Sequence, residues 1–130
     1  MKVIGLDNKS YVLNTALYRR QVNNCSQQHL RARAILKELF SLNQILEEVS
    51  LPGTKLLAAD FFIPDLKMMV EVQGQQHYKY VPHFHGNASG FRASQKRDNN
   101  KKTWCELNQI SLIELNSLES DDEWRARLSG

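Results

Sequence analysis

Apolar residues recur at helical spacing in three parts of the chain. Between residues 26 and about 40 they return every three or four positions and form one face, and Ser26 precedes them as an N-cap. A second helical pattern runs from residue 91 to about 108. Residues 121–128 predict a short last helix, with Ser120 as its cap and Trp124 as its anchor.

Runs of aliphatic and aromatic residues fill the part of the chain between the first two helices. These strand-like runs lie at residues 44–49, 55–63 and 67–72. Residues 51–54 (Leu-Pro-Gly-Thr) and 64–65 (Pro-Asp) separate them and have turn chemistry. We therefore expect three consecutive strands in an antiparallel meander.

Shorter segments complete the order of elements. Residues 2–6 and 11–13 predict an N-terminal hairpin, residues 75–90 form a long polar loop, and residues 110–115 predict a fully buried strand. The order helix, three strands, helix, strand, helix predicts an α/β fold with a mixed central sheet. The 130 residues suffice for one domain, with parts at 1–25 (hairpin extension), 26–115 (core) and 116–130 (C-terminal helix).

The composition is typical of a soluble globular protein. Hydrophobic residues make up 42% of the chain and charged residues 24%, a balance that predicts a packed core. The formal charge of +3 and the sequence pI of about 9.0 suit an anionic partner, and the basic excess crowds one short stretch at residues 96–102. Two cysteines without a CxxC spacing, and no leader pattern or apolar run of ~18 residues, predict a cytoplasmic protein without membrane association.

Two acidic residues interrupt the apolar strands. Asp60 and Glu71 each lie between apolar neighbours, and a tight turn between their strands would bring both carboxylates together. Acids on an exposed strand face are common, but these apolar flanks argue against exposure, and a buried carboxylate needs a cation or a hydrogen-bond partner. Two such carboxylates form an oxygen-rich site suited to Mg²⁺ or Mn²⁺.

This run resembles the PD-(D/E)XK nuclease superfamily, in which an acid in one strand precedes Glu-x-Lys or Glu-x-Gln in the next. It is similar to the branch of very-short-patch repair endonucleases and related phage and homing endonucleases. The resemblance covers residues 26–115 and implies a restriction-endonuclease-like mixed β-sheet flanked by helices. The positions that carry it are Asp60, Glu71, Gln73, His77, Phe91, Arg97, Asp98 and Lys101.

The resemblance implies that Asp60, Glu71 and the main-chain carbonyl of Val72 bind the metal. Gln73 stands where lysine is more common, and a glutamine orients water or phosphate only by hydrogen bonds because it carries no charge. Either Gln73 has a positioning role and another cation compensates, or the site is weakened. Active members of the branch have glutamine at this position, which favours the first alternative.

Three histidines follow the motif. His77 comes six residues after Glu71 and is either a general acid or base near the metal or a loop residue that contacts phosphate. His83 and His85 form an HxH pair that, with His77, suggests zinc, although no fourth ligand lies at a typical spacing. The aromatic residues between these histidines favour a loop that contacts DNA or covers the site.

The helix at residues 91–108 adds further candidates. Asp98 shares a face with apolar positions seven residues before and after it, so it either orients an active-site group or forms a surface ion pair. Lys101 or Lys102 would reach the scissile phosphate as the missing cation. Lys96 and Arg97 would bind the phosphate backbone, as would the loop histidines.

His29 departs from the family pattern, because the resembling nucleases often have a glutamate near the start of the first helix. His29 lies at the edge of the face that carries Ala32 and Leu36, so we expect it to face the sheet. It either replaces the glutamate as a base that orients water or is a hydrogen-bonded core histidine.

These residues together predict a Mg²⁺- or Mn²⁺-dependent endodeoxyribonuclease of the phage or homing type, acting on DNA in the host cytoplasm if phage-encoded. Two other interpretations stay open. One is a module of the same fold that binds DNA with weak or no catalysis, and the other is a zinc-dependent hydrolase that uses the loop histidines. Cutting both strands in one encounter would require a homo-oligomer.

Overall fold

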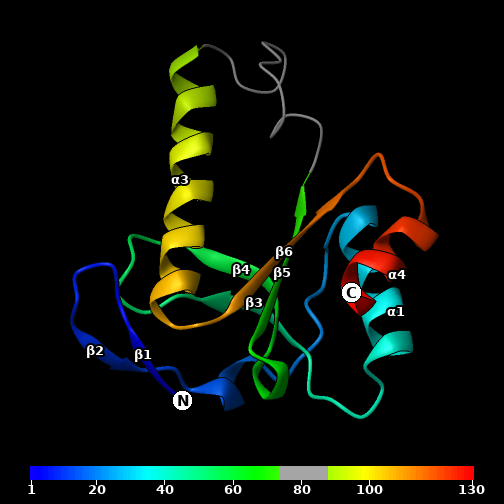
Figure 1. Cartoon of the computed structure of the whole chain (residues 1–130), viewed down its shortest axis with the longest axis horizontal. Coiled ribbons are helices and arrows are strands. Elements are labelled where there is room, and N and C mark those ends of the chain that lie inside the picture. Colours follow the sequence, from blue (N-terminus) through cyan, green and yellow to red (C-terminus); the bar gives the residue numbers. More distant parts are fainter. Residues whose placement is uncertain (74–87) are drawn as a thin grey trace.

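In the part of the chain that the structure describes, one mixed sheet of four strands lies between helices on its two faces (Figure 1). The computed structural model describes residues 1–73 and 88–130, except for the side chains of residues 88–94 and 98. The strand order is β3-β4-β5-β6, in which β3, β4 and β5 form an antiparallel meander and β6 runs parallel to β5. The strands are β3 (Leu46–Ser50), β4 (Ala58–Ile63), β5 (Met68–Gln73) and β6 (Ser111–Asn116).

Helices cover both faces of this sheet. α3 (Ala88–Leu107) lies on one face, whereas α1 (Gln27–Leu39) and α4 (Asp121–Ser129) pack together on the other (Figure 1). The strands bury side chains on both sides. Toward α3 the apolar cluster includes Leu46, Val49, Ala59, Phe62, Met69 and Trp104. Toward α1 and α4 it includes Leu36, Phe61, Ile63, Val70, Leu115 and Trp124.

The N-terminal hairpin lies beside the C-terminal end of α3. Its strands are β1 (Lys2–Ile4) and β2 (Ser10–Val12), followed by the 3-10 helix η1 (Thr15–Tyr18). Asn108 holds the hairpin, since Ile4 N donates to Asn108 Oδ1 at 2.7 Å and Asn108 Nδ2 donates to Ile4 O at 2.9 Å. The hairpin also touches the β3–β4 turn, where a Cβ on Gly53 would come within 2.3 Å of Gly5 Cα.

The predicted α/β fold with a mixed sheet, the hairpin, the meander and the helix caps are confirmed. The Ser26 side chain accepts a hydrogen bond from His29 N at 3.1 Å at the start of α1. Ser120 and Glu123 form a capping box at the start of α4, and Trp124 is fully buried. Among the described residues, no helix has the length and apolar character needed to cross a bilayer.

Several details of the prediction were wrong. β3 begins at Leu46 rather than at residue 44. β4 begins at Ala58 rather than at residue 55, because Leu56 has a φ of +58° and belongs to the turn. α3 begins at Ala88 rather than at residue 91. β6 is not fully buried, since Leu115 is its one buried residue. Among the described strands, β6 pairs with β5 alone and so lies at an edge of the sheet.

Candidate functional site

Asp60 and Glu71 face each other where the β4–β5 ladder ends. The last backbone pair is Phe61 with Val70, and the next positions on the two strands are Asp60 and Glu71. There the carboxylates replace main-chain partners. Asp60 N donates to Glu71 Oε2 at 2.8 Å, and Val72 N donates to Asp60 Oδ2 at 2.9 Å. The fold therefore brings the two predicted acids together.

Side chains of β3 stop alternating regularly between the two faces of the sheet at the position beside Asp60. Leu46 and Val49 of β3 both pack toward α3, although a regular strand would place residues three apart on opposite faces. Between them, Glu48 has a φ of +51°, in the left-handed region. The pairing of β3 with β4 on either side of Glu48 places this residue opposite Asp60.

Glu71 is a buried carboxylate that faces α3. Its Oε1 pairs with Lys101 Nζ, whereas Lys102 lies 3.9 Å from Glu114 of β6. Burial and the nearby charge of Asp60 raise the pKa of Glu71 to about 8, although Lys101 opposes this shift. Of the two lysines considered in the sequence, Lys101 is thus the one at the acidic pair, and it compensates only part of the buried charge.

The pH dependence of stability reports on Glu71. Its pKa in the folded chain lies above the ordinary value of 4.5, so its contribution to stability is fully present below pH 4.5 and is lost as the pH rises through about 8. In buffer with a chelator, we expect the melting temperature of the wild type to fall relative to that of Glu71→Gln across this window. Thermal melts at successive pH values measure the difference, and parallel curves for the two proteins would contradict it.

Gln73 ends β5 with a buried amide. It is 5% exposed, and its main-chain oxygen accepts a hydrogen bond from Ser117 N at 2.9 Å. Within the part of the chain that the structure describes, its side-chain Oε1 has no hydrogen-bond partner. A buried acceptor without a partner costs about 1–3 kcal/mol. This oxygen is therefore available to a donor that is not part of the described chain, such as water.

His29 faces the sheet, as predicted. It is 5% exposed, and its ring stacks on Phe61 with the ring centroids 4.3 Å apart. Its Nε2 lies 2.9 Å from Glu47 Oε1, and Arg33 donates to both oxygens of Glu47 at 2.8 and 2.6 Å. Burial works against ionisation of Glu47, but the hydrogen bonds from Arg33 and His29 bring its pKa below the usual value. His29 is thus a hydrogen-bonded core histidine, and its role as a base remains a prediction.

A candidate set of metal ligands includes His29 and two carboxylates. A ring nitrogen of His29, a carboxylate oxygen of Glu48 and one of Asp60 lie within 4.8 Å of one another. The sequence reasoning missed Glu48 and its neighbour Glu47. The signal was present, because these two acids interrupt an apolar strand in the same way as Asp60 and Glu71 do.

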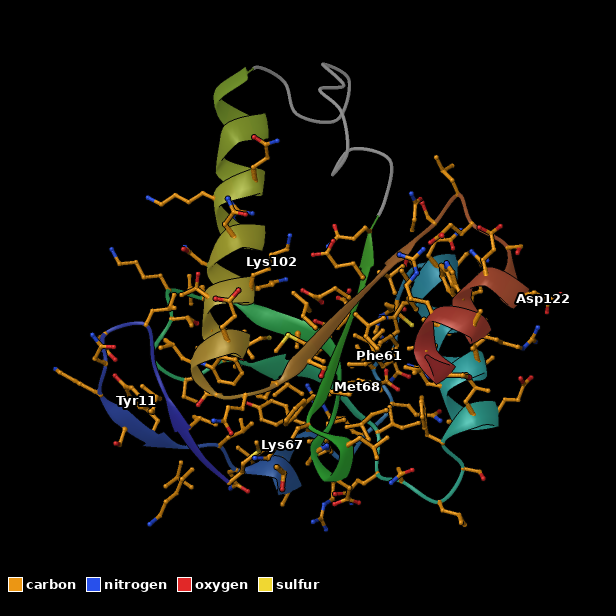
Figure 2. The ribbon with its side chains drawn as sticks, viewed as in Figure 1. Tyr11, Phe61, Lys67, Met68, Lys102 and Asp122 are labelled. Atoms are coloured by element: carbon orange, nitrogen blue, oxygen red, sulfur yellow. The ribbon has the colours of Figure 1, made fainter. Side chains whose placement is uncertain are left out.

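The basic side chains of α3 lie at a cleft. Lys96 and Arg97 are exposed and line an open cleft of about 770 Å³, together with Tyr11 of the hairpin and Lys55 of the β3–β4 turn. The residues that line this cleft come from the hairpin, the β3–β4 turn and α3, and Asp60 and Glu71 are not among them. Figure 2 shows Tyr11 on the hairpin and Lys102 on α3.

Several predicted site residues lie outside the described residues. They are His77, His83 and His85, together with the side chain of Asp98.

Cys105 of α3 is described and lies near Glu71. Burial and the charge of Glu71 raise the pKa of its thiol to about 12, so Cys105 carries no thiolate at neutral pH.

Comparisons with known proteins give viral relatives without a described activity. No protein-family model and no solved structure matches the chain. The chain is similar to the uncharacterized proteins 307L of Invertebrate iridescent virus 6 (48% identity over 63 residues) and 094L of Frog virus 3, isolate Goorha (39% over 62 residues). These matches cover 48% and 47% of this chain but only 32% and 40% of the two relatives. The match to the uncharacterized protein 033L of Invertebrate iridescent virus 3 (37% identity over 59 residues) covers 45% of this chain and 30% of that relative, so the matched segment spans well under two thirds of each relative.

Proposed function

We propose that this protein is a metal-dependent DNA endonuclease of the PD-(D/E)XK type with a restriction-endonuclease-like fold. The observation that carries the proposal is the carboxylate pair of Asp60 and Glu71, with its raised Glu71 pKa, at the end of the β4–β5 ladder. Two carboxylates in such surroundings are costly to ionise together, and a divalent cation offsets that cost. A cluster with a perturbed pKa favours a functional site over an ordinary exposed strand face.

The order of the elements supports the proposed fold. Among the described elements from α1 to β6, a helix precedes three antiparallel strands, and α3 precedes a strand parallel to the third of them. This arrangement agrees with the mixed sheet flanked by helices that the family resemblance implies. It also puts the acids on two adjacent central strands, with α3 above Glu71.

The donor atoms at this position fit Mg²⁺ or Mn²⁺. Asp60 and Glu71 offer carboxylate oxygens, and Val72, whose N–H is bonded to Asp60, offers the neighbouring main-chain carbonyl. All three are hard oxygen ligands of the kind that these cations take. When bound, such a cation polarises the phosphodiester and lowers the pKa of a water molecule.

Gln73 and Lys101 together take over the role of the motif lysine. The Oε1 of Gln73, to which no described residue donates, accepts a hydrogen bond from the attacking water and so orients it. Gln73 supplies no charge. The ammonium of Lys101, in α3, pairs with the carboxylate of Glu71 and supplies a positive charge there. In the family motif one lysine supplies both positioning and charge, whereas in this proposal Gln73 supplies the positioning and Lys101 supplies the charge.

The cleft on the α3 side is the proposed DNA surface. Lys55, Lys96 and Arg97 place three cationic side chains along it. Cations that neutralise phosphates release counterions, so the affinity for DNA should fall steeply as the salt concentration rises. Backbone contacts of this kind orient DNA and carry no sequence information. We therefore expect binding by this surface to be largely independent of sequence.

Nicking of supercoiled plasmid tests the proposed function. We expect the wild type to produce open-circular DNA in Mg²⁺ or Mn²⁺ and to stop when EDTA is added. Linear, nicked, mismatched and four-way substrates then identify the preferred DNA. Binding without cleavage in either metal would replace this proposal with a DNA-binding module. Cleavage that depends on Zn²⁺ and is lost in His83→Ala would favour a zinc-dependent hydrolase.

Lys101→Met is expected to slow nicking by about 10²–10³-fold, because it removes the charge at Glu71 and keeps the apolar stem. Without Lys101 the pKa of Glu71 should rise further, so the pH–rate profile should move to higher pH. Lys102→Met is the matched control and, among the described residues, loses the 3.9 Å contact with Glu114. Initial rates across a pH series measure both variants. Equal losses in the two would contradict a specific role for Lys101.

A further inference from the structure

A histidine and two acids from three different elements meet beside the proposed metal site. Ligand atoms of His29 in α1, Glu48 in β3 and Asp60 in β4 lie within 4.8 Å of one another. We propose that these three residues form a second cation position, which takes a transition-metal ion such as Mn²⁺ in preference to Mg²⁺. This position shares Asp60 with the proposed nuclease site. Its part in DNA cleavage rests on the proposed function, whereas its occupancy does not.

His29 is held in place as a ligand by the residues behind it. Its Nε2 is hydrogen-bonded to the buried carboxylate of Glu47, which Arg33 holds with two further hydrogen bonds. A proton shared between Nε2 and this carboxylate leaves the lone pair on Nδ1, and Nδ1 makes no hydrogen bond with any described residue. A carboxylate behind a metal-binding histidine commonly fixes the tautomer and the orientation of the ring.

The ring of His29 is also fixed from the side of the sheet. Phe61, labelled in Figure 2, stacks on it at an interplanar angle of 24°. Phe61 itself is fully buried and follows Asp60 directly in β4. The contact therefore ties the position of the imidazole to the strand that carries the shared carboxylate.

Glu48 reaches the cluster through a distortion of the main chain. Its φ of +51° is unusual for a residue other than glycine and costs of order ~1–3 kcal/mol. The distortion changes the phase of β3 at the position opposite Asp60. Both carboxylates also remain partly open to solvent, so an ion can reach them. Ions of this class bind at about 2.0–2.2 Å, so small side-chain rotations would bring the three ligand atoms to one ion.

The donor set decides the class of metal. Carboxylate and carbonyl oxygens suit Mg²⁺ and Mn²⁺ alike, whereas an imidazole nitrogen adds affinity for transition-metal ions. The set of His29, Glu48 and Asp60 should therefore bind Mn²⁺ more tightly than Mg²⁺. The all-oxygen set of Asp60, Glu71 and Val72 should distinguish the two ions less.

Titration of the intact chain with Mn²⁺, without DNA, tests this position. Electron paramagnetic resonance measures free Mn²⁺ directly, and added Mg²⁺ measures the preference between the ions. We expect His29→Gln and Glu48→Gln each to weaken Mn²⁺ binding by about tenfold or more and to reduce the preference for Mn²⁺ over Mg²⁺. Glu48→Gln changes a solvent-accessible residue and keeps its size, so the test does not depend on how His29→Gln folds.

Asp65→Asn is the control for a general effect of acidic charge. Asp65 is exposed in the 3-10 helix η2 (Pro64–Leu66), at the opposite end of the β4–β5 hairpin from Asp60. The substitution Asp65→Asn should leave Mn²⁺ binding unchanged. Wild-type Mn²⁺ affinity in folded Glu48→Gln, or an equal loss in Asp65→Asn, would overturn the proposal.

The binding readout separates this inference from the nuclease proposal. If both variants lose Mn²⁺ in a protein that never cuts DNA, the cation position stands and the nuclease function fails. If the wild type cuts DNA and both folded variants bind Mn²⁺ normally, the cation position fails and the nuclease function stands.

Discussion

Asp60→Asn is expected to slow metal-dependent nicking by about 10³-fold or more, because it removes several kcal/mol of charge stabilisation and each ~1.4 kcal/mol is a factor of ten. Asparagine keeps the size of the side chain and an oxygen that accepts the N–H of Val72. It lacks the negative charge that both proposed cation positions share. Initial rates of open-circle formation from supercoiled plasmid, in Mg²⁺ and in Mn²⁺, measure the loss.

The matched control for Asp60→Asn is again Asp65→Asn, which removes one exposed carboxylate from the same hairpin. Its nicking rate should equal that of the wild type. Circular dichroism and thermal melts of both variants establish that each is folded. Wild-type nicking by folded Asp60→Asn would reject the proposed function, since Asp60 belongs to both of the carboxylate sets found among the described residues.

Replacing Glu71 is expected to change stability and activity in opposite directions. A buried carboxylate whose pKa is raised weakens the metal-free fold at alkaline pH, so Glu71→Gln should stabilise the chain there. The same change removes a proposed metal ligand and should lower activity. A residue that costs stability and supports activity is typical of a functional site. A purely structural role for Glu71 predicts instead that its replacement destabilises the chain at every pH.

Local chemistry explains why much of the fold could be predicted from the sequence. Ser26 and Ser120 cap their helices with their own side chains, and each needs only the following turn of chain to do so. The Pro-Gly turn and the apolar runs define the meander for the same reason. Asp60 and Glu71 could be paired because they are neighbours across a hairpin with a short turn.

Features that depend on tertiary packing could not be predicted. Lys101 and Lys102 are adjacent on one helix, and only the placement of α3 over β5 decides that Lys101 reaches Glu71. Glu48 joins Asp60 because a positive φ changes the phase of β3, and no periodicity in the sequence records that change. The burial of β6 was overestimated because its apolar residues do not reveal that it is the last strand of the described sheet.

The acid behind His29 connects the stability of the fold to the second cation position. Glu47 is 2% exposed and accepts hydrogen bonds from Arg33, His29 and Val22 N. These partners come from α1 and from the segment before it. Glu47 therefore joins β3 to α1 and at the same time sets the orientation of the imidazole.

Glu47→Ala is expected to lower the free energy of unfolding by about 3–5 kcal/mol, because it removes the buried carboxylate that pairs with Arg33, whose side chain is only 13% exposed. Such a loss is a large part of the ~5–15 kcal/mol that stabilises a typical domain. Urea unfolding curves measure it, with the slope compared between variants to check that unfolding stays two-state. Glu47→Ala should also weaken Mn²⁺ binding, since the ring of His29 loses the partner that orients it.

The control for Glu47→Ala is Glu38→Ala, which breaks an exposed ion pair with Arg125 and should cost only about 0–1 kcal/mol. The double variant Glu47→Met/Arg33→Met removes both charges and should recover much of the lost stability, because an apolar pair of similar size leaves no buried charge unpaired. It should not recover Mn²⁺ affinity, since neither methionine can orient His29. A loss for Glu47→Ala no larger than that for Glu38→Ala would show that the buried pair does not anchor α1 to the sheet. Recovery of Mn²⁺ binding in the double variant would show that His29 needs no carboxylate behind it.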